Sequence, residues 1–354
     1  MIAYIFRRLM LLPLTLFGMT VIIFLFVQML GPETRASFYL NRVPRNPAAL
    51  EGIIKRYKFR DPIPFQYWYW MFGKADPQTG EIEGGLLRGN LGYSRFGGTP
   101  VAQLIQSCFP ATLELTLFSM TPVFLIGISM GITAAMNHNR WVDQIARLFS
   151  IVGYSFPGFI LGLLLLMFFY ADRGWFPIGR VSDGVRMEVI NGSFVLHTGL
   201  FTVDALLNGR VDVLWDALRH LILPVITLSY ISIASFLRIT RSSLLETLNQ
   251  DYIVTARAKG MTEDEIVRRH ALPNALLPVV TYSGVTAASS LSGVVITETI
   301  FYFPGMGYAA AEAALKFDVV TVLGFTILAG IILISVNLVV DILYGVMDPR
   351  IRMH

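Results

Sequence analysis

The stretch TARAKGMTEDEIVRRHALPN, residues 255–274, is charged and helix-patterned, yet it lies between two long apolar segments. Gly260 stands where a left-handed residue would end a first short helix. Thr262 and Glu265 then have the T-x-x-E spacing of a capping box, which predicts a second helix that starts at once and stops before Pro273. We therefore expect a helix–glycine–helix bracket across a membrane surface, and we call residues 250–274 the bracket. An ordinary cytoplasmic loop that happens to be helical fits the same pattern.

The composition indicates a membrane protein. Of the 354 residues, 54% are hydrophobic and only 15% are charged, whereas about 25% of residues are charged in soluble domains. The net charge of +4 is too small and too dispersed to indicate nucleic-acid binding. The single cysteine, Cys108, excludes an intrachain disulfide and a multi-cysteine metal site.

Enzyme signatures are absent from the sequence. The five histidines are scattered without the paired spacing of metal ligands, and no G-x-S-x-G motif marks a nucleophilic serine. No G-x4-G-K-[ST] motif is present either, so any ATP must bind to another polypeptide. We expect no catalytic residue, no metal site and no cofactor in this chain.

Six apolar segments have the length of a membrane-spanning helix, about 20 residues. They cover residues 9–30, 111–136, 145–170, 217–239, 275–300 and 319–346. The first follows two arginines, as in a signal peptide, but its apolar core is too long and no cleavage site follows. The pattern predicts an all-α polytopic protein whose two termini lie on one side. Twelve Lys and Arg residues flank that side against six on the other, outside residues 31–107, which predicts cytoplasmic termini.

Two long segments fall on the outer side. Residues 31–107 form an insertion in which we expect one amphipathic helix at 47–57 and a turn or short hairpin at 74–85. Residues 171–216 are expected to contain a short strand near 185–201. The predicted organisation is thus a first helix (1–30), an outer insertion (31–107), a membrane domain (108–346) and a cytoplasmic tail (347–354).

Three carboxylates and one stripe of small polar residues are further candidates. Glu114, Glu298 and Asp341 lie in or near predicted spans, where a carboxylate is a candidate for function, although helix-end contacts explain such residues equally simply. The stripe at 281–293 could line a substrate path or permit close helix packing. The candidate path residues are Ser283, Thr286, Ser289, Ser290 and Glu298.

The motif FPGMG, residues 303–307, follows the fifth predicted span on the outer side. Pro304 fixes its own φ, while Gly305 and Gly307 permit backbone conformations closed to other residues. We expect a tight re-entrant turn that shapes an external gate, although a plain turn between two spans also fits.

The bracket resembles the EAA loop of permease subunits in ABC importers, written EAA-x3-G-x9-I-x-L-P. Ala256, Gly260 and Leu272–Pro273 match that pattern, while Val254, Thr255 and His270 depart from it. The stretches RDPIPFQYWYW, RGNLGYS, PVAQLIQSCFPATLEL and ETIFYFPGMGYAAAEAALKFD also look like the oligopeptide and dipeptide permease B subunits, with Asn90 in place of a usual Asp. The resemblance covers most of the chain and is weakest at 73–85 and 180–210.

This resemblance implies a type I ABC importer permease fold in a bacterial or archaeal inner membrane. It implies half of a translocation path for di- or oligopeptides; related branches carry nickel or short oligosaccharides. The implied partners are a homologous second permease chain, two ABC ATPase subunits that hold ATP and magnesium, and an extracytoplasmic binding protein. The implied ATPase-coupling residues are Thr255, Ala256, Arg257, Ala258, Lys259, Gly260 and Met261. Inverted repeats with broken midplane helices and paired charges would favour the alternative, a transporter driven by an ion gradient, and the sequence shows neither.

Overall fold

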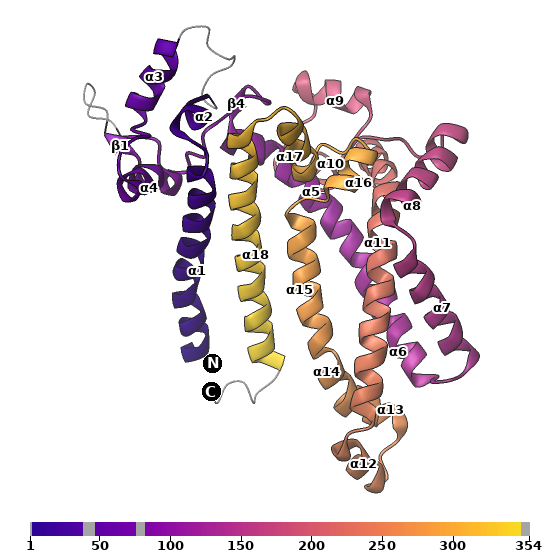
Figure 1. Cartoon of the computed structure of the whole chain (residues 1–354). Coiled ribbons are helices and arrows are strands. Elements are labelled where there is room, and N and C mark those ends of the chain that lie inside the picture. Colours follow the sequence, from indigo (N-terminus) through magenta and orange to yellow (C-terminus); the bar gives the residue numbers. More distant parts are fainter. Residues whose placement is uncertain (1, 38–46, 76–81, 348–354) are drawn as a thin grey trace.

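Long helices form the body of the molecule in the computed structural model, which describes residues 2–37, 47–75 and 82–347 (Figure 1). Helices α1 (Ile2–Gln28), α11 (Val211–Leu248) and α18 (Val319–Met347) are each apolar enough to cross a membrane. So is the continuous run of α5 (Val101–Pro122), a π-helical stretch (Val123–Ile128) and α6 (Ser129–Met136). These four confirm the first, second, fourth and sixth predicted spans, and the second begins ten residues earlier than predicted, inside the predicted insertion.

The third predicted span is bent. Helix α7 (Trp141–Ser155) meets α8 (Gly158–Leu165), which continues as a π-helical stretch to Asp172, at an angle of 91°. The bend arises at Phe156 and Pro157, because a residue before proline avoids the helical region and Phe156 is extended, with φ −97° and ψ 114°. If this pair is one span, the described residues contain five candidate spans.

The fifth predicted span is divided, so its prediction as one helix is wrong. After a π-helical stretch (Val267–Ala271), α14 (Leu272–Ala275) leads into α15 (Leu277–Leu291), and Gly293, with φ +110°, separates α15 from α16 (Val295–Ile300). At 1.5 Å per residue α15 is about 22 Å long, less than the ~30 Å hydrocarbon core. The prediction that the bracket helix stops before Pro273 is also wrong, because Pro273 lies in the first turn of α14, where a missing N–H is tolerated.

Small residues allow the helices to approach closely. In Figure 1, α15 lies between α18 and α11. A side chain added to Gly284 of α15 would collide with Val340 of α18, and one added to Gly131 of α6 would lie 2.6 Å from Thr240 Cβ of α11. Of the two interpretations of the polar stripe, Gly284 supports close helix packing on this face.

The outer insertion is a helical cap on α1. It contains α2 (Pro32–Ser37), α3 (Pro47–Arg56), α4 (Ile63–Phe72) and the hairpin of β1 (Lys74–Ala75) with β2 (Ile82–Glu83), which confirms the predicted helix and hairpin. A second hairpin pairs β3 (Tyr93–Ser94) with β4 (Thr99–Pro100). Tyr67 of α4 shares a 2.8 Å hydrogen bond with Thr20 of α1, and its ring packs 5.2 Å from that of Phe24.

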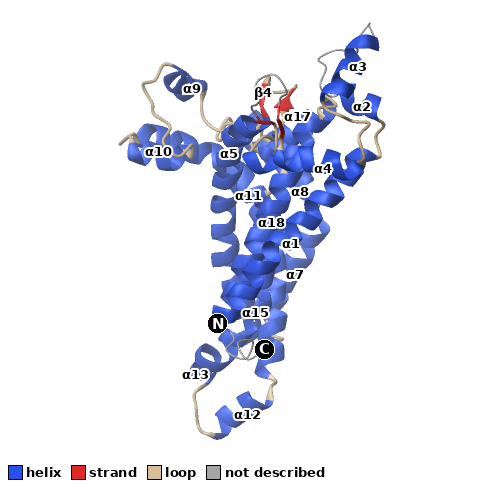
Figure 2. Ribbon diagram, turned by 90° about the vertical axis from the view of Figure 1, so that its left-hand side faces the viewer, coloured by secondary structure: helices blue, strands red, loops and turns tan. Residues whose placement is uncertain are grey.

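The second outer segment, residues 173–210, is an outer lobe built from α9 (Asp183–Ile190) and α10 (Phe201–Leu207). Figure 2 shows both helices at the side of the bundle. Phe194 and Phe201 form its core with Val181 and Val213. The predicted strand near 185–201 is wrong, since this part of the described chain forms α9 and turns, and α9 gives way to a turn at Gly192, with φ +75°.

Candidate functional site

The bracket is the part of the chain that extends furthest beyond one end of the bundle, which we call the inner end because the charge pattern predicts that it is cytoplasmic (Figure 2). It consists of α12 (Asp251–Ala258), the turn at Gly260 and α13 (Glu263–Ile266). Gly260 has φ +77°, and Thr262 forms the predicted capping box: its Oγ1 accepts from the Glu265 backbone N–H at 3.4 Å, and its own N–H donates to Glu265 Oε2 at 3.1 Å. The glycine bend and the helix restart are confirmed. The described chain also starts and ends at this end of the bundle (Figure 1).

The inner face of the bracket is packed against the bundle. Ile253 and Ala256, one helical turn apart, join Ile266 in an apolar core with Leu244 of α11 and Ala135 of α6. Ala256, one of the coupling residues that the resemblance implies, is only 6% exposed and so lies on the face that packs against the bundle. This core attaches the bracket to α11 and α6 as a packed unit.

The face of the bracket that points away from the bundle is exposed to solvent. Thr255, Ala258 and Lys259 are exposed in this chain, and Met261 is half-buried. Arg257 bridges the two helices, because its Nε lies 2.7 Å from Glu263 Oε1. That hydrogen bond lowers the pKa of Glu263 from its ordinary value, and the Thr262 backbone N–H does the same to the pKa of Glu265. The bracket therefore presents a small side chain, Ala258, beside charged groups that are already held in place.

The outer turn FPGMG packs directly against a buried glutamate, Glu298. Glu298 has no exposed surface and accepts from Thr112 Oγ1 at 2.9 Å and from the Tyr308 N–H at 2.8 Å. A Cβ on Gly305 would lie 2.5 Å from Glu298 Cδ, and one on Gly307 would lie 2.6 Å from the Val295 backbone nitrogen. Gly305 has φ −94°, so the expectation that these glycines supply unusual backbone angles is wrong. They are needed because the backbone approaches so closely that a Cβ has no room.

Other residues make the turn itself. The residue with positive φ here is Tyr302, at 52°, and helix α17 (Met306–Leu315) begins directly after Gly305. Phe303 is buried, whereas Pro304 is exposed at the tip of the turn. The structure has a turn at residues 301–305, while its place on the outer side of the membrane, its re-entrant character and its role as a gate stay predictions.

The candidate path residues do not form one surface. Ser283 and Thr286 donate their hydroxyls to carbonyl oxygens of their own helix, those of Val279 at 2.7 Å and Tyr282 at 2.8 Å. Ser290 is half-buried and Glu298 is fully buried, so of the five only Ser289 is exposed.

The exposed face of α15 has a different composition from the predicted path. It runs through Thr281, Val285 and Ser289, which are four residues apart. Residues four apart lie on one face of a helix, so this spacing in the sequence could have identified Thr281 and Val285 as members of the exposed face.

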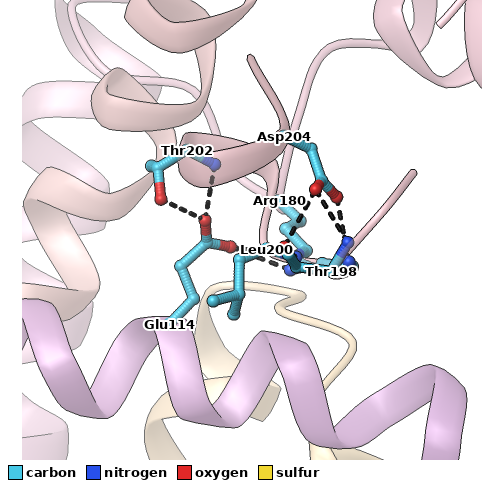
Figure 3. A network of polar contacts seen from close by, with 7 residues as sticks. Glu114, Arg180, Thr198, Leu200, Thr202 and Asp204 are labelled. Carbon is cyan, nitrogen blue, oxygen red and sulfur yellow. Dashed lines mark hydrogen bonds and ion pairs between the residues drawn. The ribbon is translucent and has the colours of Figure 1, made fainter. Parts of the chain in front are cut away.

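A second buried glutamate joins the outer lobe to α5, as Figure 3 shows. Glu114 accepts from the backbone N–H and the hydroxyl of Thr202, both at 2.7 Å, and Arg180 Nη2 lies 2.8 Å from it. Asp204 orders the same loop by accepting from the Thr198 N–H at 2.8 Å. Glu114 thus serves as a structural anchor, although it lies inside α5 and not near a helix end as the predicted span had placed it. The sequence carries no signal for its partner Arg180, which lies 66 residues away.

Two family profiles match the chain almost end to end. Residues 1–116 match the N-terminal part of the binding-protein-dependent transport system membrane component. Residues 127–353 match the binding-protein-dependent transport system inner membrane component. The chain belongs to this family. The resemblance to importer permeases that the bracket motif predicted is thereby confirmed, and the chain is a multi-pass inner-membrane transport component.

Relatives within this binding-protein-dependent family are similar over nearly the whole chain. The dipeptide transport system permease protein DppB of Alkalihalophilus pseudofirmus is 36% identical over 353 residues, which is 99% of this chain and 100% of the relative. The di/tripeptide transport system permease protein DppB of Pseudomonas aeruginosa is 37% identical over 354 residues, 99% of each chain. The oligopeptide transport system permease protein AppB of Bacillus subtilis is 33% identical over 99% of this chain and 100% of its own.

Proposed function

We propose that this chain is the permease subunit of an ATP-driven importer and forms half of a translocation path for di- or oligopeptides. The substrate class is that of its relatives, which are dipeptide, di/tripeptide and oligopeptide permeases. The partners in this proposal are a second permease chain, two ATPase subunits that bind ATP and magnesium, and an extracytoplasmic binding protein. The chain itself performs no catalysis.

The bracket is the observation that carries the proposal. The face around Ala258 is exposed, while the opposite face of the bracket is packed against α11 and α6. A force applied to the exposed face therefore reaches the membrane helices through a close-packed core. A small side chain at the centre of the exposed face allows another surface to approach closely. The ATPase groove is proposed to seat here, on the cytoplasmic side where Lys and Arg are concentrated.

The test places a large side chain on the exposed face. In membranes that contain the whole complex, Ala258→Trp is expected to insert normally but to retain far less ATPase subunit on purification. Ala171→Trp is the matched control, because Ala171 is also exposed and belongs to the π-helical stretch that continues α8, a helix that Figure 1 shows far from α12. Equal retention of the ATPase by both variants would contradict the coupling role of the bracket.

Substrate class needs a separate measurement. Cells that lack their other peptide importers are expected to take up a labelled dipeptide only when this chain and its partners are produced. Uptake of nickel or an oligosaccharide instead of the peptide would contradict the peptide assignment and leave the coupling role untouched.

A further inference from the structure

A buried carboxylate at the inner end of the bundle joins two membrane helices. Asp143, in the first turn of α7, has a side chain with no exposed surface. Arg241 of α11 holds both of its oxygens, with Nε 2.5 Å from Oδ1 and Nη2 2.9 Å from Oδ2. The Asn139 backbone N–H donates to Oδ2 at 3.0 Å. A bidentate arginine–carboxylate pair fixes the orientation of the two groups as well as their distance, so the start of α7 has a defined position against α11.

Two other basic side chains, Arg147 and His138, lie further from Asp143 than Arg241 does. Arg147 Nε lies 3.7 Å and His138 Nδ1 3.6 Å from Asp143 Oδ2, and both side chains are more than 40% exposed. Arg241 is 17% exposed and comes from a helix 98 residues further along the chain. Arg241 is therefore the partner that ties two distant elements together, whereas Arg147 and His138 both lie within five residues of Asp143.

The helices joined by this pair also carry the bracket. Arg241 lies three residues before Leu244, which packs in the bracket core with Ala135 of α6. A separate core next to it contains Ala134 of α6, Ala146 of α7 and Leu237 of α11. The bracket thus reaches α7 through α11 and α6, and the Asp143–Arg241 pair holds the start of α7 against α11.

Helix α7 leads in turn to the outer turn. Beyond the 91° bend its chain continues as α8, and a Cβ on Gly162 of α8 would lie 3.5 Å from Cε2 of Phe301. Phe301 directly follows α16, which carries the buried Glu298 of the outer turn. A displacement of α7 therefore bears on the packing of the outer turn.

We propose that Asp143 and Arg241 are positioning residues that clamp α7 to the bracket-bearing end of α11, so that movement of the bracket displaces α7 and α8. The proposal rests on the proposed function in one respect: the bracket is taken to receive the movement of an ATPase. Neither residue is assigned contact with substrate or ATP. The clamp explains why a buried charged pair is present in a region otherwise packed with alanine and leucine.

The functional test removes the charge at Asp143 in the complete reconstituted importer. Asp143→Asn is expected to retain the ATPase subunits but to lower the stimulation of ATP hydrolysis by loaded binding protein about tenfold, within the usual range of coupling between sites. Asp183→Asn is the matched control, since Asp183 pairs with Arg186 at 3.6 Å on the exposed outer lobe. Stimulation of Asp143→Asn equal to that of the wild type would overturn the clamp.

A distance measurement separates the clamp from a general loss of structure. Spin labels at Leu148 of α7 and Lys259 of the bracket, both exposed, are introduced after Cys108→Ser removes the native thiol. We expect a narrow distance distribution in the wild-type background and a broad one with Asp143→Asn. An equally narrow distribution in the variant would refute the proposal.

A loss of protein abundance and a loss of ATPase binding have different consequences for the clamp. If Asp143→Asn reduces the abundance of the protein, the same measurements are made with Arg241→Lys. Lysine keeps the positive charge but cannot form the two parallel hydrogen bonds that arginine makes to the carboxylate. Wild-type stimulation and distances in Arg241→Lys would overturn the clamp. If the wild-type complex retains no ATPase, the proposed function fails, whereas the width of the distance distribution still decides the clamp.

Discussion

Gly260→Val tests the bracket at its bend. Gly260 has φ +77°, and a Cβ at this position would meet no atom within 4 Å. The cost is therefore conformational and not steric against the rest of the protein. A non-glycine residue pays about 1–2 kcal/mol for the left-handed region. That energy corresponds to roughly a 5- to 30-fold shift in the equilibrium between the observed bend and alternatives.

The assay compares abundance with coupling. Because the strained residue lies in an exposed turn, Gly260→Val is expected to insert and accumulate almost as the wild type does. Retention of the ATPase, and its stimulation by loaded binding protein, should fall by at most about 5- to 30-fold, because the loss reaches the full shift only when the bent form is no longer in large excess. Gly260→Asn should lose less, because asparagine adopts positive φ more readily.

A control with the same strain elsewhere makes the result specific. Gly192 in the outer lobe has φ +75° and equally open surroundings, so Gly192→Val carries a similar backbone cost and should retain the ATPase normally. Ala271→Val, a substitution just beyond the bend, is unsuitable as a second control because Ala271 is fully buried in the bracket core. Full coupling in Gly260→Val would refute the bracket and leave residues 250–274 as an ordinary loop.

Three other outcomes are expected. Gly305→Ala should lower the melting temperature in detergent, since overpacking costs about 1–3 kcal/mol, whereas Gly52→Ala, with open surroundings, should not; equal melting temperatures would contradict the close approach at Glu298. Limited proteolysis from the outer face should spare residues 47–75, and rapid cutting throughout them would show that the cap is not ordered. The pKa of Glu265 is lowered, so its bonds to Thr262 are fully present above the ordinary glutamate pKa and are lost as the pH falls through the lowered value. Amide hydrogen exchange of α13 should thus show protection that declines only in acid, and a decline beginning near neutral pH would contradict this.

Features set by neighbouring residues were predictable from the sequence. The bend at Gly260 and the restart at Thr262 depend on backbone preferences and on one side chain three residues away, and both are present. The positions of four membrane helices follow from the apolar runs, although the second and fourth are longer than those runs predict. The inward position of Ala256 was also readable, because Ile253 lies one turn before it on the same face.

Features set by distant contacts were not predictable. The reason for glycine at 305 is the carboxyl group of Glu298 and the hydroxyl of Thr112, which the fold alone brings together. The size of the bend at Pro157 depends on what α8 packs against, since proline marks a break without fixing its angle. Nothing in the local sequence pairs Asp143 with a residue 98 positions away.

The anchor at Glu114 has a consequence for the order in which the chain assembles. Its partner Arg180 lies beyond α7 and α8, and Thr202 is later still, so α5 is made well before either can reach the carboxylate. A buried charge without its partner is strongly unfavourable. The part of α5 around Glu114 must therefore stay in contact with water until the third hydrophobic segment has inserted and the lobe has emerged. Docking of the outer lobe then marks the point in biogenesis at which α5 can withdraw from water and the helices beside it can close.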